Sequence, residues 1–162
     1  GTATSIMVGH AIGRGETEKA YIYAGRSLSI QIVGAMLMGV LLFLFAGNIF
    51  QFYKVDPVVI GEARKILTVM SIGMWIRAAN HVIIIGVLRS GGDSRFSLFL
   101  DGFIIWLVGV PVTAIGAFWL GLPIQYVYAL TFSEEITKLL VGTWRYFSRK
   151  WIHNLTERIS EV

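Results

Sequence analysis

Long apolar stretches alternate with short polar ones along this chain of 162 residues. A helix that crosses a bilayer needs roughly 20 mostly apolar residues. Four stretches reach that length: residues 27–50, 66–88, 96–120 and 123–144. The first contains QIVGAMLMGVLLFLFAG, which does not alternate apolar and polar residues as the strands of a membrane barrel do. The pattern therefore predicts an all-α, polytopic transmembrane helical bundle with four full spans.

Two shorter segments flank these spans. Residues 1–12 are typical of the end of a further, partial helix. Because the chain starts at Gly and shows no basic-then-apolar leader, we expect upstream residues to precede it. Residues 148–162 are polar and basic, with apolar residues at helical spacing, which predicts an amphipathic helix on the membrane surface. Its apolar residues are Trp151, Ile152, Leu155 and Ile159. We thus expect transmembrane helices over 1–147 and a cytoplasmic tail over 148–162.

The composition favours the lipid bilayer as the surroundings of this chain. Only 15% of the residues are charged and the mean hydropathy is +0.67, whereas a soluble domain carries about 25% charged residues. The net charge of +4 does not indicate a nucleic-acid partner, since the basic residues lie between apolar runs and not along one face. With no Cys and three scattered His residues, neither a disulfide nor a metal site is expected.

The distribution of basic residues predicts the orientation. Nine Lys and Arg residues fall before the first span, between the second and third spans, and in the tail, whereas three fall on the opposite side. Loops rich in Lys and Arg stay in the cytoplasm. We therefore expect a multi-pass protein of the plasma (inner) membrane with a cytoplasmic C-terminus. Trp144 and Trp151 fit the aromatic belt at the membrane interface.

Three short sequences carry a resemblance. They are VGHAIGRGE at residues 8–16, GVLRSGGDS at 86–94 and WLVGVP at 106–111. In this order and spacing the set resembles the multidrug and toxic-compound extrusion (MATE) family of secondary transporters. The resemblance implies twelve helices in two six-helix lobes, of which this chain would hold the end of helix 8 and helices 9 to 12. The N-terminal lobe of the same protein would be its partner.

The resemblance also implies a function. Members of the family export cationic or amphipathic organic compounds, including drugs, in exchange for inward Na⁺ or H⁺, without another cofactor. Some members carry a carboxylate in the tenth helix, where this chain has Arg77, Asn80 and His81 and no acid. No coupling-ion ligand is therefore assigned by position.

Five ionisable residues lie inside the predicted spans: Arg77, Asp101, Glu134, Glu135 and Lys138. A charge near the bilayer centre costs at least ~2.5–3.5 kcal/mol, so such residues are functional candidates by default. At ~1.5 Å per residue, Arg77 and Glu134 lie roughly 16 Å from the cytoplasmic boundary, near the midplane. We expect Arg77 to pair with Glu134 or Glu135, and Asp101 to pair with Lys138.

This pairing would leave one carboxylate without a partner. An unpaired buried acid can bind a proton or a cation, which is what ion coupling requires, and our hypothesis is that Glu134 or Glu135 titrates during transport. The alternative is that the pairs only hold helices together.

Further candidates for a substrate path share helix faces with these charges. They are Met70, Met74, Asn80, His81, Tyr128 and Thr131. Met and aromatic side chains suit apolar cations through soft packing and cation–π contact, although ordinary helix packing explains the same spacing. His81 also fits a satisfied interhelical polar residue. Pro111 is a candidate hinge, because it removes one helical hydrogen bond.

Three other functions compete with this interpretation. A lipid-linked saccharide flippase of the same superfamily would need a basic cavity, whereas the five charges sum to −1. A non-transporting membrane scaffold fragment is a second alternative. An intramembrane enzyme is a third, but no nucleophile–base spacing or metal set supports it.

Overall fold

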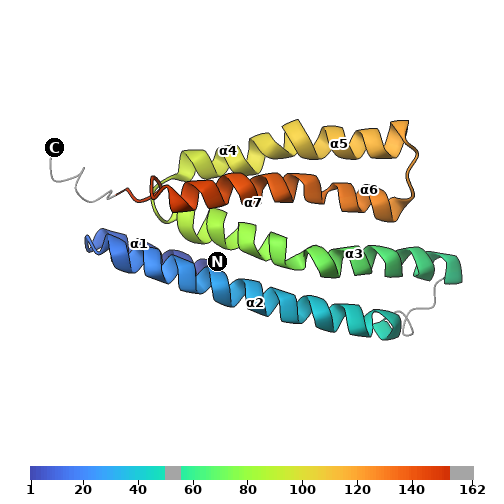
Figure 1. Cartoon of the computed structure of the whole chain (residues 1–162), viewed down its shortest axis with the longest axis horizontal. Helices are drawn as coiled ribbons and strands as arrows, with labels where there is room; N and C mark the ends of the chain where they lie inside the picture. The colour runs from blue at the N-terminus through green and yellow to red at the C-terminus, as the bar shows by residue number, and fades with distance from the viewer. Residues whose placement is uncertain (50–55, 154–162) are drawn as a thin grey trace.

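The computed structural model describes residues 1–49 and 56–153, and every regular element in these ranges is helical. Helix α1 (Thr2–Gly13) turns back into α2 (Thr17–Ile49), and α3 (Pro57–His81) continues without a break as the π-helical segment η2 (Val82–Arg89). The helices form an elongated bundle in which the α1–α2 turn and the end of the described chain lie at the same end (Figure 1).

The second half of the chain forms two neighbouring rods. The first rod consists of α4 (Ser94–Ile104), η3 (Ile105–Gly109), α5 (Val110–Ala114) and η4 (Ile115–Trp119). The second consists of α6 (Ile124–Leu130) and α7 (Phe132–Phe147). In Figure 1 the α6–α7 rod lies between the α4–α5 rod and α3. This position brings the charges of α7 next to both neighbours.

Within residues 1–49 and 56–153, three helices are long and apolar enough to cross a membrane: Thr17–Ile49, Pro57–Arg89 and Ser94–Trp119. They correspond to the first three predicted spans. The fourth predicted span, 123–144, is not one continuous helix, because it is interrupted at Thr131. The Thr131 hydroxyl donates to the Tyr128 carbonyl at 2.7 Å, and its amide donates to the same oxygen at 3.1 Å. A side chain that bonds its own backbone in this way competes with the helical ladder.

Local signals explain where the helices begin and end. The Asp56 side chain accepts a hydrogen bond from the Val58 amide at 2.8 Å, and Pro57 occupies the first turn of α3, as expected for a helix start. Gly15 and Gly92 have φ of 75° and 91°, a conformation that glycine adopts at little cost. Both glycines belong to the sequences that carry the family resemblance, and their local role is to turn the chain.

Pro111 lies in a spanning helix that changes its winding on both sides. The π-helical segments η3 and η4 precede and follow α5, which contains Pro111 near its start. Proline has no amide hydrogen and cannot form one of the helical hydrogen bonds. The wider π-helical turns on either side change the hydrogen-bonding pattern locally, so that the helix continues past this position. The role of Pro111 as a hinge stays a prediction.

The start of the tail, residues 148–153, is not helical: residues 148–151 form turns and residues 152–153 have no regular structure. Leu155 and Ile159, on which the predicted amphipathic helix depends, lie outside the described residues. Trp151 is 0% exposed, so its ring packs inside the protein, whereas a residue of an aromatic belt would present its ring at the surface. The indole Nε1 of Trp151 donates to the Tyr146 carbonyl at 3.0 Å, and its ring fills the space beside Gly91. Trp144 is exposed on α7, as an interfacial residue would be.

Close helix contact depends on small residues along α2 and α3. A Cβ at Gly39 would lie 2.5 Å from the Ser71 carbonyl oxygen, which is backbone and cannot rotate away. Small residues of this kind let membrane helices approach closely. Gly34, on the same helix, has nothing within 4 Å of the corresponding position.

We therefore expect Gly39→Ala to destabilise the protein by about 1–3 kcal/mol, because the added methyl forces α2 and α3 apart. Thermal unfolding in detergent measures this effect, with Gly34→Ala as the matched control. The control should unfold no earlier than the wild type, because Ala is the better helix former. Equal melting temperatures for the two variants would contradict the close contact.

Candidate functional site

Four of the five predicted ionisable residues surround one polar cavity. Arg77 comes from α3, Asp101 from α4, and Glu135 and Lys138 from α7. The cavity measures about 160 Å³. Its other lining residues are Asn80, His81, Ile84 and Ile85. The fifth residue, Glu134, lines a separate pocket.

Glu135 is held by two residues of α3. Its Oε1 lies 3.6 Å from Arg77 Nε, and the Asn80 amide Nδ2 donates to Glu135 Oε2 at 2.7 Å and to its carbonyl at 2.8 Å. The Arg77 guanidinium also lies over the rings of Tyr128 and Phe132, at 5.7 and 5.2 Å from their centroids. Of the two partners foreseen for Arg77, the structure selects Glu135.

The expected pair of Asp101 with Lys138 is not formed in the described part of the chain. Asp101 instead accepts from Arg89 Nη2 at 3.0 Å, and Arg89 Nε donates to Ser97, one turn earlier on α4. Lys138 pairs with Glu134 on its own helix, at 3.6 Å. Arg89 is the last residue of η2, and the contact between η2 and α4 brings it to Asp101.

This geometry corrects the expectation of an unpaired carboxylate. Each of the three acids has one basic partner: Glu134 with Lys138, Glu135 with Arg77 and Asp101 with Arg89. The charges of the cluster, with Arg89 included, therefore sum to zero and not to −1. Nearly neutral clusters are expected where charges are held at membrane depth.

Two of the residues that line the polar cavity have a buried polar atom that makes no hydrogen bond within the described part of the chain. Asn80 is 4% exposed, and its buried Oδ1 accepts no hydrogen bond from the described residues. Arg77 Nε is likewise buried and donates to none of them. A polar cavity larger than the ~30 Å³ that one water occupies in the liquid can hydrate such groups.

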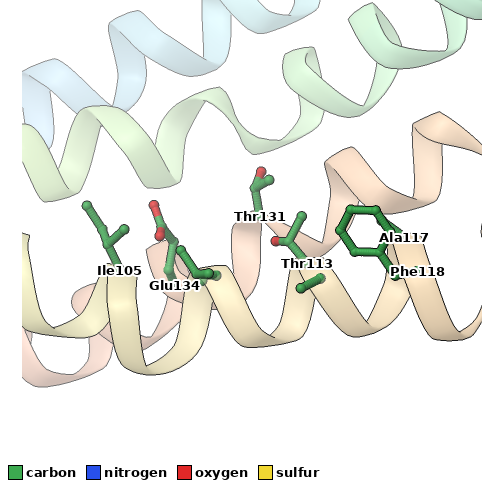
Figure 2. A pocket seen from close by; sticks show the side chains of 9 residues that line it. Ile105, Thr113, Ala117, Phe118, Thr131 and Glu134 are labelled. Carbon is green, nitrogen blue, oxygen red and sulfur yellow. The ribbon is translucent and has the colours of Figure 1, made fainter.

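The pocket beside Glu134 has a different character. It measures about 390 Å³ and lies between the rod from η3 to η4 and the α6–α7 rod. Figure 2 shows Thr113, Thr131 and Glu134 among the apolar side chains of Ile105 and Phe118. A Cβ at Gly109 would lie 2.1 Å from Glu134 Oε2, so the glycine makes room for the carboxylate.

The predicted substrate-path residues do not form one surface. Asn80 and His81 line the polar cavity, whereas Thr131 lines the apolar pocket. Tyr128 lies against Arg77, and Met74 lies near Gly39 on the side of α3 that faces α2. Met70 lines neither of these two pockets, and Pro111 is exposed. Their roles in transport stay predictions.

Sequence reasoning missed several residues of these sites. Ser97 is fully buried, accepts from Arg89 and donates to the Ile84 carbonyl at 3.2 Å within η2. Thr113 was also missed, because a small residue within an apolar run gives no distinct signal. Gly109 belongs to the WLVGVP sequence, but its role beside Glu134 was not foreseen. Within residues 1–49 and 56–153, no group of three or more His, Cys, Asp or Glu side chains could hold a metal ion.

The long apolar helices and the paired charges inside them define a multi-pass α-helical membrane protein. A sequence model of the MatE family matches residues 1–115. The chain therefore belongs to the MatE family, which confirms its resemblance to the MATE transporters. It is a protein of a transporter family and not an enzyme.

Curated relatives extend this likeness. The chain is 26% identical to the "Uncharacterized transporter YisQ" of Bacillus subtilis over 92% of its own length and 32% of the relative's. It is 33% identical to "Multidrug resistance protein MdtK" of Pectobacterium atrosepticum over 68% of its own length and 24% of the relative's. "Multidrug resistance protein PmpM" of Pseudomonas aeruginosa is 30% identical over 69% of the chain and 23% of the relative. The chain thus spans about a quarter to a third of these relatives. No solved structure matches it.

The pairing of Asp101 can be tested with double-mutant cycles for stability. We expect Asp101→Asn and Arg89→Met to be coupled by about 0.5–1 kcal/mol, since both side chains of this pair are partly exposed. Asp101→Asn and Lys138→Met should show a smaller coupling. Thermal or urea unfolding in detergent gives both values, and a larger coupling with Lys138 would contradict the observed pairing.

Proposed function

We propose that the full-length protein is a secondary antiporter that exports cationic or amphipathic organic compounds in exchange for Na⁺ or H⁺. Two findings support this function: membership of the MatE family and similarity to proteins named as multidrug resistance proteins. The observation that carries it is the Glu134 carboxylate at the edge of a largely apolar pocket.

The chemistry of that pocket suits such a cargo. Its volume of about 390 Å³ lies within the range of sites for drug-sized ligands, roughly 300–1,000 Å³. Apolar walls bind the hydrophobic part of an organic cation. The Glu134 carboxylate is paired with Lys138 in this structure, and in low-dielectric surroundings it would attract the charge of the cargo when that pair opens. Phe118 adds an aromatic face, which favours cations further.

The charge balance argues against a phosphate-bearing cargo. A flippase for lipid-linked saccharides needs a surplus of basic side chains to hold phosphate groups. The cluster has three acids and three bases in one-to-one pairs. It therefore offers no free positive charge of the kind that the flippase alternative requires.

The broken rod α6–α7 serves in this proposal as the fourth membrane crossing. It extends from Ile124 to Phe147, which at ~1.5 Å per residue is about 35 Å, enough for a ~30 Å hydrocarbon core. Interrupted helices are tolerated at membrane depth where the break lines a cavity. Thr131, at the break, lines the apolar pocket.

Within the whole protein, α1 would end helix 8. Helices 9 to 12 would be α2, α3–η2, the α4–η4 rod and α6–α7. The protein would lie in the plasma (inner) membrane. Its C-terminus, with residues 148–162 as the tail, would be on the cytoplasmic side. The partner of this part of the chain is the N-terminal lobe, and rocking of the two lobes would give alternating access to the cargo.

Replacing the Glu134 carboxylate tests the function. In cells that express the full-length protein, we expect Glu134→Gln to lower the apparent affinity for a permanently charged dye by about tenfold or more, because a charge-assisted contact is lost. Dye accumulation, with Na⁺ and pH varied separately, measures the effect and identifies the coupling ion.

The matched control for this experiment is Glu62→Gln. Glu62 forms an exposed ion pair with Lys65 near the start of α3, far along the helix from the cavities. This variant should export the dye like the wild type. Unchanged export by Glu134→Gln would remove the pocket from the transport path, and absence of ion-driven export by the wild type would contradict the proposed function.

A further inference from the structure

An apolar groove follows the seam between α2 and α3, away from the charge cluster. It measures about 460 Å³, and large apolar side chains of both helices line it: Met36, Val40 and Phe43 of α2, with Ile72 and Trp75 of α3. The three side chains from α2 are about half exposed, and Ile72 is 67% exposed. The groove is therefore open to the surroundings of the helix pair.

A basic side chain closes one end of this groove. A Cβ at Gly47 would lie 2.7 Å from Arg64 Nη2, so the guanidinium rests against the α2 backbone at this point. Gly47 lies one turn beyond Phe43 on α2. Arg64 lies about two turns before Ser71, a further lining residue, on α3. These spacings keep each residue on the groove side of its own helix.

The groove has the length of one membrane leaflet. Arg64 lies near the start of α3, in a charged segment with Glu62 and Lys65, as a residue at the membrane interface would. From Arg64 to Trp75 there are 75 − 64 = 11 residues, which is about 16 Å along a helix. Half of a ~30 Å hydrocarbon core has nearly the same thickness. The groove thus extends from the interface to about the bilayer centre.

The Arg64 guanidinium makes no ion pair within the described part of the chain. The neighbouring acids are engaged elsewhere: Glu62 pairs with Lys65 at 2.7 Å, and Asp56 caps α3. Residues 50–55 contain no acidic side chain. A guanidinium matches the geometry of a phosphate with two parallel hydrogen bonds. A phosphate group at the membrane interface would therefore complement its charge.

The surface of α2 beside the groove favours lipid over another helix. Helices that meet inside a membrane present small residues to each other. The small residues Ala35, Gly39 and Ala46 of α2 are already buried, whereas its exposed side chains include the large Leu37 and Leu44. A flexible acyl chain fits between such side chains without the close backbone approach that a second helix requires.

We propose that this groove binds one anionic phospholipid, with an acyl chain in the groove and its phosphate on Arg64. The site does not depend on the cargo or on the coupling ion. In the proposed orientation the lipid belongs to the outer leaflet. A zwitterionic lipid fits less well, because its own cationic group competes with Arg64 for the phosphate. The bound lipid contacts both α2 and α3 and stabilises their packing.

Quenching of Trp75 fluorescence tests this site. The full-length protein is reconstituted in phosphatidylcholine vesicles with increasing fractions of dibrominated phosphatidylglycerol, whose bromine atoms quench a tryptophan that the acyl chain touches. The Trp75 signal is the difference between the wild type and Trp75→Phe. We expect half-maximal quenching at a fraction about tenfold lower than with dibrominated phosphatidylcholine, because the phosphate gains a charge-assisted contact.

Four variants separate the two parts of the site. Arg64→Gln removes the charge and should make the two lipids quench Trp75 equally, whereas Lys65→Gln, the matched control from an exposed ion pair, should keep the preference. Val40→Phe fills the groove and should weaken quenching by both lipids. Leu37→Phe, at an exposed position of α2 that does not line the groove, should not change it.

Three results would overturn the inference. Quenching by phosphatidylglycerol in simple proportion to its fraction in the bilayer would show that the groove holds ordinary exchanging lipid. No Trp75 quenching by either lipid would show that another part of the protein covers the groove. A preference retained by Arg64→Gln would assign the phosphate to a different residue. All three leave dye export unaffected, so the proposed function is judged separately.

Discussion

A charge buried in the membrane must have a partner, and this constraint organises the centre of the structure. The three acids of the cluster come from α4 and α7, and their basic partners come from α3, η2 and α7. Because an unpaired charge at this depth is costly, the ion pairs limit how α3, α4 and α7 can pack. The same requirement makes the cluster sensitive to any added charge.

Small residues make the required contacts possible. Gly109 lets the Glu134 carboxylate lie against the η3 backbone, and Gly73 leaves room for the Phe132 ring, over which the Arg77 guanidinium lies. A side chain at either glycine would occupy the space of a group that supports the cluster. The positions of the charges therefore depend on residues that have no charge and no side chain.

A second network ties the cytoplasmic end of the proposed topology together. Arg145 Nε lies 2.7 Å from Asp93 Oδ2, and the His153 amide donates to the Gly91 carbonyl. The ring of Trp151 stacks on Tyr146, which stacks in turn on Tyr21 of α2. The loop GGD at residues 91–93, part of the sequences typical of the family, is thus the place where the end of α7 docks. The loop therefore helps to pack the end of α7, and it also reverses the direction of the chain.

The sequence alone determined the fold class, because spans of about 20 apolar residues can form only helices in lipid, and its ordered motifs determined the family. It also identified Arg77, Glu134, Glu135 and Lys138 as charges inside the predicted spans, since ionisable residues inside apolar runs are conspicuous. Tertiary structure decided the partners of Arg77 and Asp101. Arg89 lies at a helix end and only the packing of η2 on α4 brings it to Asp101. Likewise, the break at Thr131 and the burial of Trp151 depend on hydrogen bonds and contacts that hydrophobic periodicity does not encode.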